Sequence, residues 1–130
     1  MFERAIELFS AIVQQQPDWE HGICYYELGI CYEELENLKE AERCFRKALS
    51  YDPNYYLYLA ALASFLYLHG DSREAFNAHL DLIKIDARNR DQRGMEKAQV
   101  ALRALGKKLG MADEEVLENI RRVINQGERH

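Results

Sequence analysis

Cysteine and histidine are the side chains here that could bind a metal or act as nucleophiles, so their spacing is considered first. Cys24, Cys31 and Cys44 form no CxxC pair, although that spacing is typical of zinc sites and redox-active thiols. His21 and Cys24 are one helical turn apart, but no further ligand cluster completes a zinc site. We therefore expect no metal and no cofactor, and we interpret the cysteines as small packed thiols.

Motifs for catalysis are also missing from the sequence. It contains no GxSxG, P-loop, GxGxxG or HExxH pattern, and these are the patterns that indicate a nucleophilic serine, a bound nucleotide or a metalloprotease. Glutamates are plentiful enough for a paired-carboxylate site, but nothing in their spacing selects one pair. We therefore expect that the chain is not an enzyme.

Composition limits the class of protein. Hydrophobic residues make up 48% of the 130 residues, enough for the core of one domain. Only two prolines and seven glycines interrupt the chain, which favours long helices over many short strands. No apolar run approaches the roughly 18 residues that span a bilayer, and residues 1–5 lack the layout of a signal peptide. These features predict a cytoplasmic protein.

Charge is distributed unevenly along the chain. Residues 1–87 carry 15 acids and 7 bases, a net charge of −8, whereas residues 88–130 carry 7 acids and 10 bases, a net charge of +3. An acidic body argues against nucleic acid as the main partner. The segment 88–108 holds seven bases and two acids, so contact with nucleic acid or an anionic membrane is an alternative. Since it lacks interleaved aromatic residues, we expect it to face solvent or the acidic body.

A repeated pattern of apolar and small residues organises the first two thirds of the chain. Its strongest copy is Tyr25-x2-Leu28-Gly29-x2-Tyr32, followed by Ala41-x3-Phe45 and Pro53. Weaker copies are Leu62, Ala63, Leu66, Ala75, His79 and Ala87 on one side and Ala5, Phe9 and Pro17 on the other. Apolar residues three and four apart form one face of a helix, small residues let two helices approach, and proline ends a helix.

This pattern resembles the tetratricopeptide repeat, with tyrosine where that family usually has tryptophan. The resemblance implies an all-α solenoid of helix–turn–helix units over residues 1–87. Its units are the second helix of a partial repeat at 1–17, a full repeat at 22–55 and a divergent full repeat at 56–89. His79 replaces a packing aromatic of the family, and we expect a partly buried core histidine there.

Residues 88–130 do not continue the repeat, and we expect two helices there that cap the array, since stacked repeats need a polar-faced cap. The whole chain should therefore contain seven helices, at about 2–16, 20–35, 38–51, 54–69, 72–85, 88–108 and 112–126.

The resemblance also implies a binding surface, because tetratricopeptide repeats bind peptides on the concave side made by the first helix of each unit. The groove positions of the second unit are Ile23, Tyr26, Ile30, Glu33 and Glu34. Those of the third unit are Leu57, Ala60, Ser64, Tyr67 and Leu68. This apolar and aromatic surface with an acidic edge suits an extended or helical segment of another protein that carries apolar anchors and a basic residue.

Alternatives remain for several of these side chains. Tyr26 and Tyr67 fit the groove wall and the core equally well, whereas Tyr25, Tyr32 and Phe45 should be core residues. Leu57 and Leu68 could be covered by the C-terminal helices, and Glu33 and Glu34 could be a solvated face. Cochaperones of this family hold a C-terminal carboxylate with lysine, arginine and asparagine. Tyr26, Ile30 and Ala60 occupy those positions here, so that clamp is absent.

Three kinds of protein–protein interaction remain open. The first is a peptide-binding adaptor. The second is a chaperone, because the segment 63–71 is similar to the third-repeat turn of type III secretion translocator chaperones, which are also short, acidic and built from about three such units. The third is self-assembly: helix 2–16 lacks a partner helix, so Phe2, Ile6, Phe9 and Val13 could form an open edge and join copies into a homo-oligomer. The alternative is that the chain is a fragment and that the partner helix lies upstream.

Overall fold

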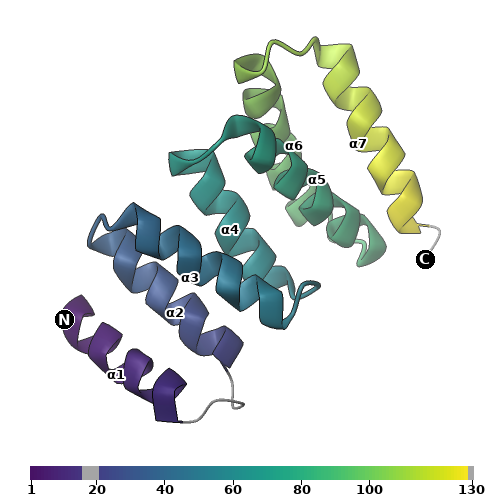
Figure 1. The fold of residues 1–130 in the computed structure, drawn as a ribbon. Helices are drawn as coiled ribbons and strands as arrows, with labels where there is room; N and C mark the ends of the chain where they lie inside the picture. Colours follow the sequence, from purple (N-terminus) through teal and green to yellow (C-terminus); the bar gives the residue numbers. More distant parts are fainter. Residues whose placement is uncertain (16–20, 129–130) are drawn as a thin grey trace. The chain divides into compact units, whose positions relative to one another are not determined.

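A computed structural model describes residues 1–15 and 21–128, and this part of the chain is helical throughout, apart from short turns. The predicted all-α class is therefore confirmed. The described helices are α1 (Phe2–Gln15), α2 (His21–Glu34), α3 (Leu38–Tyr51), α4 (Tyr56–His69), α5 (Ser72–Arg88), α6 (Gln92–Lys108) and α7 (Asp113–Glu128) (Figure 1). The predicted stop at Pro17 lies outside the described residues.

The largest boundary difference concerns α5 and α6. The sequence predicts that the first ends near residue 85 and that the second begins near residue 88, whereas α5 continues to Arg88 and α6 begins at Gln92. The reason is the turn itself, in which the Asp91 side chain accepts a hydrogen bond from the backbone N–H of Gly94 at 3.0 Å. An aspartate at this position caps the start of a helix.

Three of the turns share one hydrogen-bonding arrangement. At the end of α5 the Asp91 N–H donates to the Asp86 carbonyl at 2.8 Å and the Arg90 N–H to the Ala87 carbonyl at 3.1 Å. The same pair of bonds closes α2 and α6, so all three helices end in a Schellman motif. The left-handed residues of these motifs are Glu36, Arg90 and Gly110, with φ of 60°, 56° and 75°.

The chain forms two compact units, Met1–Leu62 and Ala63–His130, with the boundary inside α4. We call them unit 1 and unit 2 and describe each by itself. This division concerns packing only; the repeat boundaries at 1–17 and 56–89 and the division at residue 88 stay predictions from the sequence.

In unit 1, α2 packs against both α1 and α3, and the three helices lie side by side (Figure 1). The core between α2 and α3 consists of buried side chains: Cys24, Leu28, Cys31, Ala41, Cys44, Phe45 and Ala48. Gly29 faces this core, because a Cβ atom at that position would lie 2.6 Å from Cε1 of Phe45. The predicted close approach of the two helices therefore depends on Gly29 and Phe45 together.

In unit 2, α5 packs against α6 and also against α7. The core is formed by buried residues of these three helices and of the part of α4 that belongs to unit 2. They are chiefly Phe65, Leu66, Phe76, Leu82, Ile83, Leu102, Leu105, Val116 and Ile120. Gly106 allows the last two helices to meet, since a Cβ atom there would lie 2.5 Å from a methyl carbon of Val116. The two C-terminal helices thus contribute to the core of unit 2, and their role as a cap of the repeats stays a prediction.

Candidate functional site

The groove residues predicted on α2 are partly accessible. Ile23, Tyr26, Ile30 and Glu33 are half-buried and Glu34 is exposed. The Tyr26 ring lies 6.5 Å from the ring of Phe45 and 5.9 Å from that of Tyr58, centroid to centroid, and burial raises the pKa of its hydroxyl. Tyr26 therefore contacts the core with one side of its ring and keeps part of its surface accessible.

Unit 1 also has accessible aromatic side chains between residues 51 and 58, and the repeat pattern did not identify them. The Tyr55 ring meets Tyr58 edge-on at 4.7 Å, and Tyr51 stacks on Tyr25 at 6.1 Å. Tyr51, Tyr55 and Tyr56 are all exposed, as is the predicted groove residue Leu57, and Ala60 is half-buried. The signal was present in the unusual density of tyrosines between residues 51 and 58.

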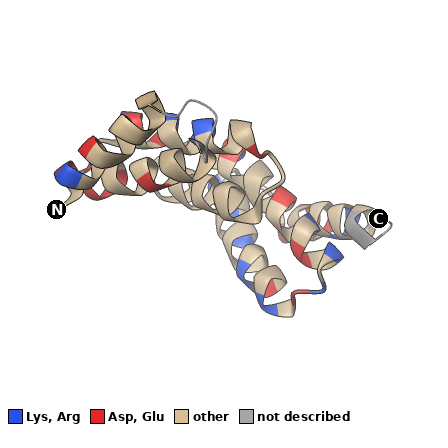
Figure 2. Ribbon diagram, turned by 90° about the horizontal axis from the view of Figure 1, so that it is seen from below, with Lys and Arg blue, Asp and Glu red and all other residues tan. Residues whose placement is uncertain are grey.

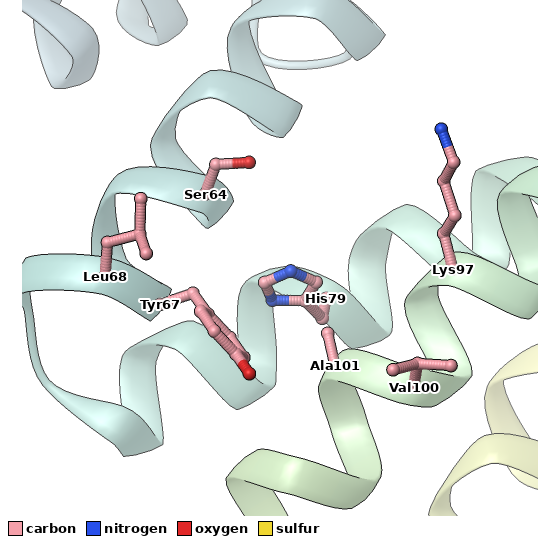
Figure 3. Close-up of a pocket in the computed structure, with 7 residues that line it drawn as sticks. All are labelled: Ser64, Tyr67, Leu68, His79, Lys97, Val100 and Ala101. Carbon is pink, nitrogen blue, oxygen red and sulfur yellow. The ribbon is translucent and has the colours of Figure 1, made fainter.

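A cleft in unit 2 brings together the other predicted groove residues. Its volume is about 330 Å³, and we call it the unit 2 cleft. It is lined by Ser64, Tyr67 and Leu68 of α4, His79 of α5, and Lys97, Val100 and Ala101 of α6. Figure 3 shows Ser64 and Leu68 on one side of the opening, the α6 residues on the other, and the His79 ring between them.

His79 forms part of the inner wall of the unit 2 cleft. It is 8% exposed, which confirms the predicted core histidine. Its Nδ1 lies 2.8 Å from the carbonyl oxygen of Ala75, and a carbonyl only accepts hydrogen bonds, so Nδ1 carries the proton. Burial lowers the pKa of the ring, although the contact with Ala75 opposes this shift. The imidazole is therefore neutral near pH 7.

The opening of the unit 2 cleft is apolar and basic. Leu68 is 66% exposed and Val100 is 70% exposed, and Lys97 is also exposed. The Lys108 Nζ lies 5.6 Å from the centroid of the Tyr67 ring, a cation–π contact. The alternative that the C-terminal helices cover Leu68 is wrong for the described residues, because α6 forms the opposite wall and leaves this side chain accessible.

A smaller cavity of about 190 Å³ lies in unit 1. It is lined by Ser10, Val13, Gln14, Tyr25, Leu28, Tyr32 and Arg43. Tyr25 and Tyr32 are consequently only half-buried, which corrects the prediction that both are core residues. The physical reason is that α1 covers their face of α2 incompletely. Phe45, the third residue of that prediction, is 2% exposed and does belong to the core.

The cysteines offer no reactive site. All three cysteines are buried and none forms a disulfide; burial raises the pKa of Cys44 to about 11 and also raises that of Cys31. A protonated, buried thiol is a poor nucleophile. Among the described residues, no group of three histidine, cysteine or acidic side chains could hold a metal ion. Of the helices that the structure describes, none is long and apolar enough to cross a membrane.

Comparison with known protein families matches residues 22–55 to the tetratricopeptide repeat. These are the residues of the full repeat with the strongest pattern, so a tetratricopeptide repeat is present in the chain. Comparisons with curated proteins and with solved structures give no match. The resemblance to translocator chaperones of type III secretion accordingly has no support.

Proposed function

We propose that the chain is a non-catalytic module that binds a peptide or helix of another protein in the groove formed by the first helix of each repeat. Residues 22–55 of this chain are a tetratricopeptide repeat. The single observation that carries the proposal is the unit 2 cleft. Three predicted groove residues, Ser64, Tyr67 and Leu68, line it. Its volume of about 330 Å³ lies at the lower end of the range of ligand pockets.

The exposure of Leu68 and Val100 supports this role. Both are large aliphatic side chains that are about two-thirds accessible on facing walls of one cleft. Burying such a side chain in a partner contributes roughly 1.5–3 kcal/mol. A concave apolar site next to polar groups is where binding energy usually concentrates. In unit 1, Tyr26 and Leu57 offer further contact surface of the same kind.

The proposal is tested by capture from an extract of the native cells. We expect wild type to retain a partner protein, and we expect Leu68→Asp to retain at least about tenfold less of it. The reason is that a carboxylate would have to be buried in an apolar contact. Leu35→Asp is the matched control, since Leu35 is also exposed but lies at the end of α2. Equal retention by wild type and both variants, with folding verified by circular dichroism, would place the interface elsewhere.

A second candidate function is self-assembly through α1. No residue of α1 is fully buried, although the helix is strongly amphipathic. Phe2, Ile6, Phe9 and Val13 are only half-buried, and Leu8 is 59% exposed. An incompletely covered apolar helix favours association with a second copy.

Sedimentation velocity tests this second candidate. A wild-type dimer that dissociates in Leu8→Glu but persists in Leu38→Glu would support it, because Leu38 is exposed on α3 instead. A strict monomer at the highest soluble concentration would exclude self-assembly through α1.

A further inference from the structure

We infer that the unit 2 cleft selects an acidic segment of its partner. An aliphatic side chain of the segment enters between α4 and α6, and Asp or Glu side chains on both sides of it contact Lys97 and Lys108. The inference rests on the proposed function, because it names the chemistry of the segment bound at that cleft.

Four residues of α6 are spaced so that they share one face of the helix. Lys97, Ala101, Ala104 and Lys108 follow one another at intervals of four, three and four residues. Residues at these intervals share one face of a helix. This face therefore carries small apolar residues in its middle and a lysine at each end. The lysines are eleven residues apart, about 16 Å along the helix axis, which a segment of a few turns can span.

Both lysines belong to the unit 2 cleft. Lys97 lines it directly, and Lys108 stands over the Tyr67 ring, which lines it too. Within the part of the chain that the structure describes, neither lysine has an ion-pair partner. Their charges are therefore not neutralised by the protein itself. They remain available to a partner, and their long stems let the amines reach across the opening.

The charge around the opening of the unit 2 cleft comes from α6. The α4 wall adds none, because residues 54–70 contain no Asp, Glu, Lys or Arg. His79, on the inner wall, is neutral near pH 7. The α6 wall belongs to the segment 88–108, with its seven bases and two acids, and several basic positions follow one another along this helix (Figure 2). The potential at the opening is consequently positive and favours carboxylates.

A protein segment fits these features better than a nucleic acid does. Unit 2 as a whole carries 12 bases and 11 acids, a net charge of +1, so it lacks the broad basic surface that a polyanion needs. The opening presents Leu68 and Val100, which are aliphatic, where a base would stack on an aromatic ring. The unit 2 cleft has one lysine at each end of an aliphatic opening, and this arrangement matches a peptide with acidic and aliphatic side chains.

The test uses a random peptide display library, selected on the immobilised full chain. We expect selected peptides that combine Leu, Ile or Val with several Asp or Glu residues. A selected peptide should bind Lys97→Glu/Lys108→Glu about tenfold more weakly, because two attractions become repulsions. It should bind the matched control Arg103→Glu/Lys107→Glu within about twofold. The control changes the charge of α6 by the same amount at exposed positions that do not line the cleft.

Other results would overturn the inference and are distinguishable from a failure of the proposed function. Selected peptides that are neutral or basic but lose affinity for Leu68→Asp would contradict the acidic partner and leave the proposed function intact. Equal loss of affinity in Lys97→Glu/Lys108→Glu and in the control Arg103→Glu/Lys107→Glu would mean that binding depends on the net charge of α6 and not on the cleft. Oligothymidine that binds more tightly than the selected peptides, and that loses affinity for Lys97→Glu/Lys108→Glu, would identify a nucleic acid as the occupant. Self-association in sedimentation that the same variant abolishes would identify a second copy of the chain. Selection of no peptide would contradict both proposals.

Discussion

Units 1 and 2 are built alike but present opposite chemistry. In each, a buried glycine lets two helices meet, Gly29 against Phe45 in one and Gly106 against Val116 in the other. The accessible surfaces differ: α2 ends in Glu33 and Glu34 beside tyrosines, whereas α6 carries lysines beside aliphatic residues. Residues 1–62 hold 5 bases and 11 acids, a net charge of −6, against +1 for unit 2. The packing residues therefore determine the fold and leave the exposed residues free to differ in charge between the two units.

Removing a large buried side chain from one unit at a time should change the stability of the protein most. Phe45→Ala and Phe76→Ala each remove a buried ring and should lower the free energy of unfolding by about 3–5 kcal/mol. Hydrogen exchange should show the larger loss of protection in α2 and α3 for the first variant and in α5 to α7 for the second. Uniform loss of protection in both variants would mean that the two units unfold together.

A smaller effect is expected when the close helix contacts are overpacked. Gly29→Ala and Gly106→Ala place a methyl group within 2.6 Å and 2.5 Å of buried atoms, and each should destabilise the protein by about 1–3 kcal/mol. Urea denaturation measures this change. In an uncrowded helix the same substitution stabilises by roughly 0.5–1 kcal/mol, so a gain in stability at either position would contradict the packing that both units share.

The pH dependence should distinguish unit 2 through His79. Burial holds the folded pKa of this ring below its unfolded value, so the unfolded state binds the proton first. Stability from this group is therefore complete above about pH 6.5 and falls as the pH is lowered below it. The loss between about pH 7 and pH 5 should be smaller in His79→Phe, measured by urea denaturation across that range. Identical pH profiles would show that His79 does not contribute.

The smallest effect concerns the turns, where the two units should behave alike. Glu36 in unit 1 and Arg90 in unit 2 occupy left-handed positions that glycine adopts without steric cost. Glu36→Gly and Arg90→Gly should each raise the free energy of unfolding by up to about 1 kcal/mol. Urea denaturation measures this change as a higher midpoint. Gly110→Ala, at the equivalent position after α6, is the reverse control and should lower it.

Much of the fold was predictable because it depends on periodicity. The spacing of Leu28, Gly29 and Phe45 defined the helix pair in unit 1, and the same spacing placed Ser64, Tyr67 and Leu68 on the wall that lines the unit 2 cleft. Tyr25 and Tyr32 occupy equally regular positions, but their burial depends on how completely α1 covers them. No local pattern in a sequence contains that information.

The other half of the unit 2 cleft was not predictable from the repeat. Lys97, Val100 and Lys108 lie in the segment that does not continue the pattern, so no groove position was assigned to them. Their position beside Tyr67 and Leu68 follows only from the packing of unit 2, in which α6 lies against α5. Gly106 is a similar case, because no repeat position identifies what packs against it, and only the structure shows the Val116 methyl group there.

The shared helix α4 has a consequence for how the protein is made. Its buried residues divide between the units, Tyr58, Leu59 and Leu62 in the first and Ala63, Phe65 and Leu66 in the second. Residues 54–70 contain no Asp, Glu, Lys or Arg, so the charges that can act as gatekeepers against aggregation lie outside α4, at Asp52 and Asp71. Ala63, Phe65 and Leu66 belong to unit 2 and are buried only once that unit is complete. Aggregation of the nascent chain should therefore be greatest after α4 has left the ribosome and before the rest of unit 2 has been made.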